Sequence, residues 1–114
     1  MGIPDGGAEE LAWGLLRVPG AWPSKGMWTH VHEYRAILWN GRVFWEVVRE
    51  VEFRPDGALE SRYDGTDPGG PVDDTPHDPP TEFASGTMTR LDRDAFERYW
   101  SARHLREAEP GAEG

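Results

Sequence analysis

Alternating apolar and polar residues mark out the middle of the chain as an antiparallel meander. Asn40-Gly41 lies between two β-prone runs, residues 28–39 and 43–53. This dipeptide favours a type I′ hairpin turn, because both of its positions need positive φ. Pro55-Asp56-Gly57 predicts a second turn that leads into a third strand over residues 58–63. We therefore expect a sheet built from sequential hairpins.

The two-residue turn sets the register of the first hairpin. On one face, a regular ladder pairs Leu38 with Val43, Ala36 with Trp45, Tyr34 with Val47, His32 with Arg49, His30 with Val51 and Trp28 with Phe53. On the other face, it pairs Ile37 with Phe44, Arg35 with Glu46, Glu33 with Val48 and Val31 with Glu50. The first face is apolar apart from His30, His32 and Arg49, so these three polar residues are predicted to lie together.

Flanking segments predict helices at both ends of the chain. Leu11, Leu15 and Val18 recur at helical spacing before Pro19-Gly20, which indicates a short helix over residues 9–18. Near the other end, Asp92 is a good N-cap for a helix from Arg93 to about Glu107. That helix carries an apolar stripe expected to pack on the sheet, consisting of Phe96, Tyr99 and Trp100.

Between the third strand and the last helix, residues 64–82 are rich in Pro, Gly and Asp and contain no Lys or Arg. This composition predicts a long acidic loop, and weak alternation over residues 83–91 predicts a fourth strand. The fold class is therefore α+β: one domain over residues 1–114, with a curved antiparallel sheet of about four strands, a short N-terminal helix and a C-terminal helix on one face. Residues 1–7 and 108–114 are expected to be flexible. The residues expected to be mostly buried are Trp28, Tyr34, Trp45, Val47, Val51, Phe53, Phe96, Tyr99 and Trp100.

Composition narrows the classes of function. The chain has 114 residues, 21 acidic against 12 basic, a formal net charge of −9 and no cysteine. Disulfides and thiolate chemistry are excluded, and a nucleic-acid partner is not expected because phosphates need clustered cations. Met1 to Glu10 lacks the basic region and the apolar region that mark a signal peptide. No apolar run approaches the roughly 18 residues that a membrane-spanning helix needs. We expect a cytoplasmic protein without a membrane partner.

The strand-turn-strand segment from Glu46 to Tyr63 resembles a family of small uncharacterised bacterial proteins. Its members carry an E-V-R-K-V-E-V-F-x-D-G signature, a Pro-rich acidic loop and a terminal helix of the EEF-E-x-x-W type. The matching residues here are Glu46, Val47, Arg49, Val51, Phe53, Asp56 and Gly57, then Pro79-Pro80, then Asp94-Ala95-Phe96-Glu97 and Trp100. The resemblance covers residues 28–102 and implies a small α+β fold. It implies no activity, and the His30-x-His32 pair is outside the shared pattern.

His30-x-His32 places two imidazoles on one face of a strand, as strands that bind metals do. The glutamate that follows such a pair in cupins is missing, since Ala36 and Ile37 stand at the corresponding positions. We therefore predict neither a metal nor another cofactor from the pair. An alternative function is a small-molecule pocket or an enzyme with isomerase-, cyclase- or lyase-like acid–base chemistry, using His30, His32, Tyr34 and Arg49.

The acidic loop suggests protein binding. Its aspartates do not follow the spacing of a calcium-binding EF-hand loop. Negative charge on a long loop suits docking to a basic protein, which electrostatic attraction would accelerate. The leading hypothesis is a small acidic, non-catalytic binding protein of the antitoxin, immunity or accessory type. Its predicted binding residues are Asp67, Asp73, Asp74, His77 and Asp78.

Overall fold

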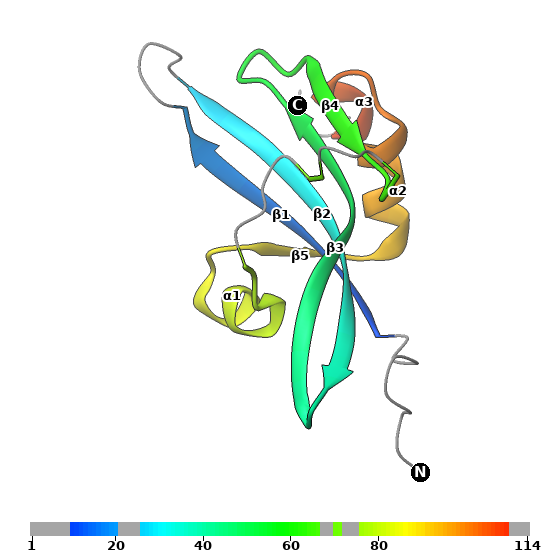
Figure 1. Cartoon of the computed structure of the whole chain (residues 1–114). Helices are drawn as coiled ribbons and strands as arrows, with labels where there is room; N and C mark the ends of the chain where they lie inside the picture. The colour runs from blue at the N-terminus through cyan, green and yellow to red at the C-terminus, as the bar shows by residue number, and fades with distance from the viewer. Residues whose placement is uncertain (1–9, 21–25, 67–69, 72–75, 110–114) are drawn as a thin grey trace.

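The computed structural model describes residues 10–20, 26–66, 70–71 and 76–109. These form an α+β structure with an open antiparallel sheet of five strands in the order β4-β3-β2-β1-β5, and three short helices (Figure 1). The strands are β1 (Leu11–Pro19), β2 (Met27–Trp39), β3 (Arg42–Phe53), β4 (Leu59–Tyr63) and β5 (Thr89–Leu91). The helices are α1 (Pro79–Ser85), α2 (Arg93–Ser101) and α3 (Leu105–Ala108).

The predicted N-terminal helix is wrong, because residues 11–19 form strand β1. This strand lies beside β2 and pairs with it from Leu11–Arg35 to Pro19–Met27. The segment is apolar at nearly every position, so its pattern fits both the 3.6-residue period of a helix and the two-residue period of a strand. Pairing with β2 gives its backbone N–H and C=O groups hydrogen-bond partners along the strand. Gly14 lets this strand pack closely beneath Met88, which covers this part of the sheet. A Cβ at Gly14 would lie 1.9 Å from the sulfur of Met88.

The first predicted turn is confirmed, with Asn40 and Gly41 at φ of 51° and 73° between β2 and β3. The β2–β3 hairpin extends past its neighbours, as Figure 1 shows. Strand β1 pairs with β2 only as far as Arg35, and β4 pairs with β3 only from Glu50 onwards. Residues 36–46 are therefore a two-stranded ribbon, which we call the hairpin arm.

The two faces of the sheet have separate cores. We call the face with His30, His32 and Tyr34 the histidine face, and the face with Glu33 and Arg49 the arginine face. Helices α2 and α3 cover the arginine face, where the buried apolar residues are Leu15, Val31, Val51, Phe53, Phe96, Tyr99, Ala102 and Ala108. Helix α1 and Met88 cover part of the histidine face around Ala12 and Tyr34. Of the residues predicted to be buried, Tyr34, Val51, Phe53, Phe96 and Tyr99 are buried, and Trp28, Trp45, Val47 and Trp100 are half-buried.

Two predicted boundaries after β4 are wrong. The loop expected over 64–82 ends at Asp78, because Pro79 and Pro80 occupy the first positions of α1, where proline needs no backbone partner. The strand expected over 83–91 is reduced to β5, since residues 83–85 are the end of α1 and Gly86 terminates it with φ of 81°. The sheet consequently has a helix on its histidine face that was not expected.

The C-terminal helix begins as predicted, with the Asp92 side chain accepting a hydrogen bond from the Ala95 backbone at 2.7 Å. The helix does not run to residue 107 but ends at Ser101, and α3 follows. The guanidinium of Arg62 donates to the backbone oxygens of Trp100 and Ala102 at 2.7 and 2.8 Å, and so satisfies carbonyl groups where α2 ends.

Of the predicted flexible ends, residues 1–7 and 110–114 lie outside the described residues. Ala108 is buried, and the Glu109 carboxylate accepts hydrogen bonds from Arg17 and Tyr99. Among the helices in the described part of the chain, none has the length and apolar character needed to span a bilayer.

Candidate functional site

One extra residue in β3 decides which side chains share the histidine face. Tyr34 pairs with Val47, but Glu33, the preceding residue of β2, pairs with Arg49, so Val48 forms a β-bulge. All of the predicted pairs between the turn and the bulge are confirmed. Beyond the bulge each β3 residue lies on the opposite face from the one a regular ladder predicts. The predicted pairs that are wrong are His32–Arg49, His30–Val51, Trp28–Phe53, Glu33–Val48 and Val31–Glu50.

On the arginine face, the bulge places Arg49 opposite Glu33. The guanidinium donates two hydrogen bonds to this carboxylate, at 2.8 and 3.1 Å, and two to the carboxylate of Glu97, at 2.7 and 3.3 Å. Its carbon Cζ lies 4.7 Å from the centroid of the Phe96 ring. The indole of Trp13 also donates to Glu33, at 2.8 Å. Arg49 is thus held between two carboxylates and an aromatic ring, away from the histidines.

Arg49 and Glu33 of this arginine-face group shift each other's pKa. Burial alone would raise the pKa of Glu33, but the hydrogen bonds from Arg49 and Trp13 together outweigh it and hold that pKa below its usual value. The pKa of Arg49 is raised, first by its hydrogen bond to Glu33. Each group therefore stabilises the charged form of the other, which is the pattern of a structural ion pair.

On the histidine face, the bulge brings Glu50 opposite His32 and Glu52 opposite His30. The Nε2 atom of His32 lies 2.5 Å from Oε2 of Glu50, and Nδ1 of His30 lies 3.6 Å from the same oxygen. One donor atom from each of His30, His32 and Glu50 lies within 4.8 Å of the others. The side chains of His32 and Glu50 are 0% and 1% exposed. We call these three residues the His–Glu cluster.

The second nitrogen of each imidazole also has a polar neighbour. Nδ1 of His32 lies 2.7 Å from the hydroxyl of Tyr34, and Nε2 of His30 lies 3.1 Å from a carboxylate oxygen of Glu52. Burial raises the pKa of Glu52, and the negative charge of Glu50 raises it further, while His30 opposes the change. Both rings are therefore oriented by groups outside the cluster.

The four residues of the predicted pocket do not lie on one face of the sheet. Tyr34 and His32 are fully buried and touch each other, and the rings of both lie within 5.3 to 5.4 Å of the His77 ring. Arg49 is on the opposite face of the sheet, so it cannot hold a ligand against these histidines.

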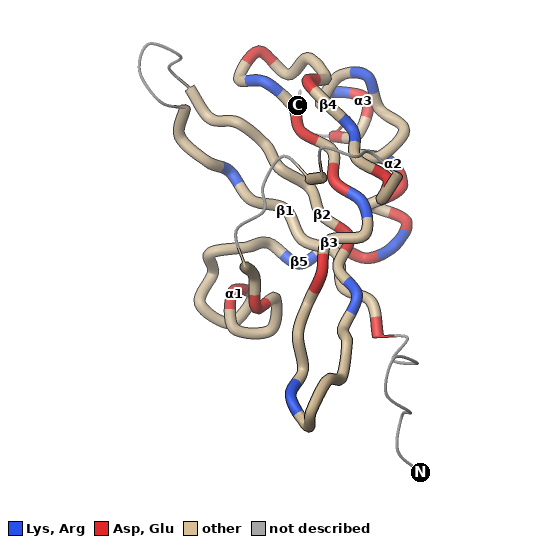
Figure 2. Tube along the Cα trace, viewed as in Figure 1, with Lys and Arg blue, Asp and Glu red and all other residues tan. Residues whose placement is uncertain are grey.

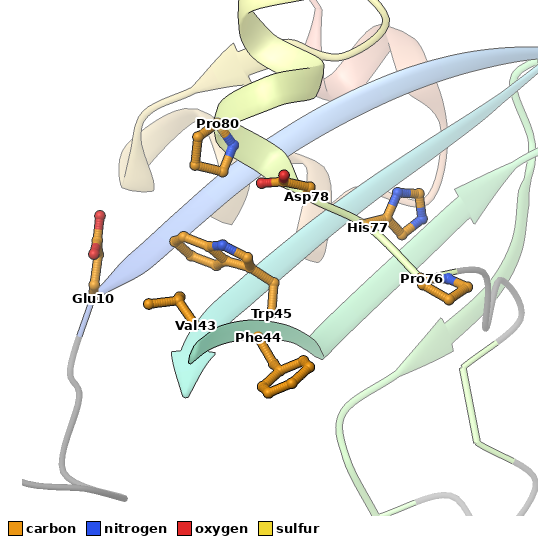
Figure 3. A pocket seen from close by; sticks show the side chains of 8 residues that line it. All are labelled: Glu10, Val43, Phe44, Trp45, Pro76, His77, Asp78 and Pro80. Carbon is orange, nitrogen blue, oxygen red and sulfur yellow. The ribbon is translucent and has the colours of Figure 1, made fainter. Parts of the chain in front are cut away.

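An open groove of about 540 Å³ lies between the hairpin arm and residues 76–80 on the histidine face. Figure 3 shows Trp45 in its centre, beneath Pro80 and Asp78, while Phe44 points away from the other labelled side chains. The residues that line it are Glu10, Val43, Phe44, Trp45, Pro76, His77, Asp78 and Pro80. Two of the predicted binding residues, His77 and Asp78, therefore contribute to a groove. Asp67, Asp73 and Asp74 lie outside the described residues.

Glu50 and Glu52 are the polar residues of this site that sequence reasoning did not select. Their spacing of two, which matches that of His30 and His32, is a signal that both carboxylates share one strand face. The face itself depends on whether β3 contains a bulge. No residue near Val48 predicts a bulge, because residues 43–53 form an uninterrupted β-prone run in the sequence.

Comparison of the chain with family models, with curated proteins and with solved structures returns no significant match. The resemblance to small uncharacterised bacterial proteins stays a prediction. The site is therefore interpreted from its own chemistry.

Proposed function

We propose that this protein is a non-catalytic binding module that recognises a basic segment of a protein partner in the groove beside its hairpin arm. The observation that carries the proposal is an exposed apolar arm next to a groove with acidic side chains. Trp39, Val43 and Phe44 are 62%, 59% and 48% exposed. Large apolar side chains gathered on one projecting element are typical of interaction surfaces.

The backbone of the arm supports the same proposal. Two-stranded ribbons are marginally stable in water by themselves, and unpaired strand edges readily accept another chain. Beyond Ala36, whose backbone N–H donates to the carbonyl oxygen of Glu10, the arm has such edges on both sides with respect to the described residues, since β1 and β4 stop before it. A partner segment that lies along the arm would satisfy backbone groups and cover apolar side chains together.

Charge selects the chemistry of the partner. Two carboxylates, of Glu10 and Asp78, line the groove, and none of its described lining residues is Lys or Arg. The arm itself carries a single basic residue, Arg42, and Figure 2 shows its trace as mainly uncharged. The whole chain has a net charge of −9. A segment with one large apolar side chain between Arg or Lys residues is complementary to this surface.

The arrangement of the histidines favours binding over catalysis. An acid–base enzyme needs its proton-transferring groups within reach of a substrate. His32 and Tyr34 are fully buried, and Arg49 faces the other side of the sheet. Of the described residues whose rings contact His32, only His77 lines the groove.

Short synthetic peptides test the proposal. One set has a single Leu or Phe between Arg and Lys residues, and a matched set has Asp and Glu in place of the basic residues. Titrated into the full chain and followed by amide NMR shifts, the basic set should perturb residues 43–45 and 76–80 at low salt, and the acidic set should not. Binding should weaken as salt rises, because exposed charges are screened over about 8–10 Å near physiological ionic strength.

Matched charge variants locate the binding surface. Glu10→Gln with Asp78→Asn should weaken binding of the basic peptides by about 3- to 10-fold, as expected for two exposed ion pairs. Glu60→Gln with Asp94→Asn removes the same charge from exposed positions outside the groove and should have little effect. Equal weakening by both pairs, or shifts confined to other surfaces, would contradict the proposed docking site.

A further inference from the structure

The geometry points to a second site, independent of the groove: a divalent transition-metal site formed by Nδ1 of His30, Nε2 of His32 and Oε2 of Glu50. The three donors come from two neighbouring strands of the sheet, which hold their backbones rigidly. The bulge at Val48 decides which β3 residues face the histidines, because a regular ladder that kept Val48 paired would put Arg49 opposite His32.

The orientation of the two imidazoles supports a cation between them and Glu50. Each ring turns one nitrogen toward the same carboxylate oxygen, at 2.5 Å for His32 and 3.6 Å for His30. Each ring turns its other nitrogen toward an oxygen that can accept a hydrogen bond, the Tyr34 hydroxyl at 2.7 Å for His32 or the Glu52 carboxylate at 3.1 Å for His30. When these outer nitrogens carry the protons, both inner nitrogens present lone pairs toward an anion.

Such an arrangement is the one that metal-binding histidines adopt. A ligating imidazole usually donates its other N–H to a carboxylate or another oxygen, which orients the ring and raises its basicity. Glu52 would have this role for His30, and Tyr34 would have it for His32. Glu52 and Tyr34 each lie next to the imidazole nitrogen that points away from Glu50. This observation is independent of the short distances among the three donor atoms.

The three donor atoms, which lie within 4.8 Å of one another, would have to move to surround an ion. Ligand atoms around a tetrahedral ion with bonds of about 2.0–2.2 Å lie about 3.3–3.6 Å apart. The separation of 3.6 Å between His30 and Glu50 already fits, and the contact of 2.5 Å between His32 and Glu50 must open by about 1 Å.

The donor set also selects the metal. Two imidazole nitrogens and one carboxylate suit Zn²⁺, Co²⁺ or Ni²⁺, whereas Ca²⁺ and Mg²⁺ prefer sites made of oxygen atoms. The side chain of His30 is 12% exposed and that of Glu52 is 10% exposed, so the edge of the site near His30 reaches the surface. His32 and Glu50 close the inner side.

Metal binding by the full chain, without an affinity tag, tests this site. After dialysis against EDTA, calorimetry with ZnCl₂ should show one ion per chain, and CoCl₂ should produce visible absorption bands of a four-coordinate nitrogen and oxygen site. Bound Zn²⁺ should raise the melting temperature in proportion to the logarithm of its concentration above Kd. MgCl₂ at the same concentration should give no binding signal in calorimetry and no change in melting temperature.

Two histidine variants distinguish the site from adventitious binding. His30→Gln, at the more exposed ligand, should keep the fold by circular dichroism and weaken Zn²⁺ binding by tenfold or more. His104→Gln removes a histidine that bonds to the backbone of Asp56 and should bind Zn²⁺ as the unmodified chain does. The inference is overturned if the unmodified chain binds no stoichiometric Zn²⁺ or Co²⁺, as expected when His32 instead donates its Nε2–H to Glu50. Equal weakening in the two variants would also overturn it.

Discussion

The two polar groups on either side of the bulge use the same two strands but differ in how their charges are balanced. On the arginine face, the Glu33 carboxylate receives two hydrogen bonds from Arg49, and Arg49 also reaches Glu97. On the histidine face, Glu50 and Glu52 face two imidazoles, which are neutral or positive depending on their protons. The first group has a permanent cation, while the second needs a proton or a metal ion. This difference indicates a structural role for the first group and a ligand-dependent role for the second.

Loss of the permanent cation should have the largest effect. Arg49→Gln leaves Glu33 buried with the Trp13 indole as its remaining hydrogen-bond donor among those described, and should lower the free energy of unfolding by about 3 kcal/mol. Chemical denaturation at neutral pH measures this change. The double variant Arg49→Gln with Glu33→Gln should recover most of the loss, because no unpaired charge remains. A double variant as unstable as the single one would mean that packing of Arg49 on Phe96 dominates.

The same variant has a predictable pH dependence. The folded-state pKa of Glu33 is lowered, so its contribution to stability is fully present above the unfolded pKa of about 4.3 and is lost as pH falls through the folded value. In Arg49→Gln this contribution should be absent, and the difference in stability between the two proteins should shrink as the pH falls below about 4. A constant difference across this range would contradict the assignment of the ion pair.

Deletion of the bulge should have a smaller effect. Without Val48, Val47 is followed directly by Arg49, so the pairs Tyr34–Val47 and Glu33–Arg49 remain and the ladder becomes regular. The expected loss is about 1 kcal/mol, for one half-buried valine. Thermal unfolding and cross-strand NMR contacts between His32 and Glu50 check this. Deletion of Val51 is the control: it moves Glu52 to the apolar core of the arginine face and should prevent folding.

Removal of charge from the histidine face should have the smallest effect when no metal is bound. In EDTA, Glu50→Gln keeps a group that can hydrogen-bond to Nε2 of His32 whichever ring nitrogen carries the proton, and it removes a buried anion, so the unfolding free energy should change by less than about 1 kcal/mol. With Zn²⁺ added, the melting temperature of the unmodified chain should rise and that of Glu50→Gln should not. A loss in EDTA as large as that of Arg49→Gln would show that both groups are structural.

Several features followed from the sequence because their causes are local. Asn40-Gly41 set the turn, and the five predicted pairs from that turn to the bulge are correct, since register propagates from a two-residue turn. Asp92 began α2 because a carboxylate that caps a helix acts on the next residues along the chain. Alternation along β2 also placed His30, His32 and Tyr34 on one face.

Other features were decided only by contacts between distant segments. Residues 11–19 became a strand because β2 offered an edge, although their apolar spacing also suits a helix. The bulge at Val48 moved Arg49 to one face and Glu50 to the other, and it leaves no local mark in a continuous β-prone run. The residue types of the site were therefore visible in the sequence. Which of them meet was decided by the tertiary structure, because one extra residue in a strand inverts every side chain beyond it.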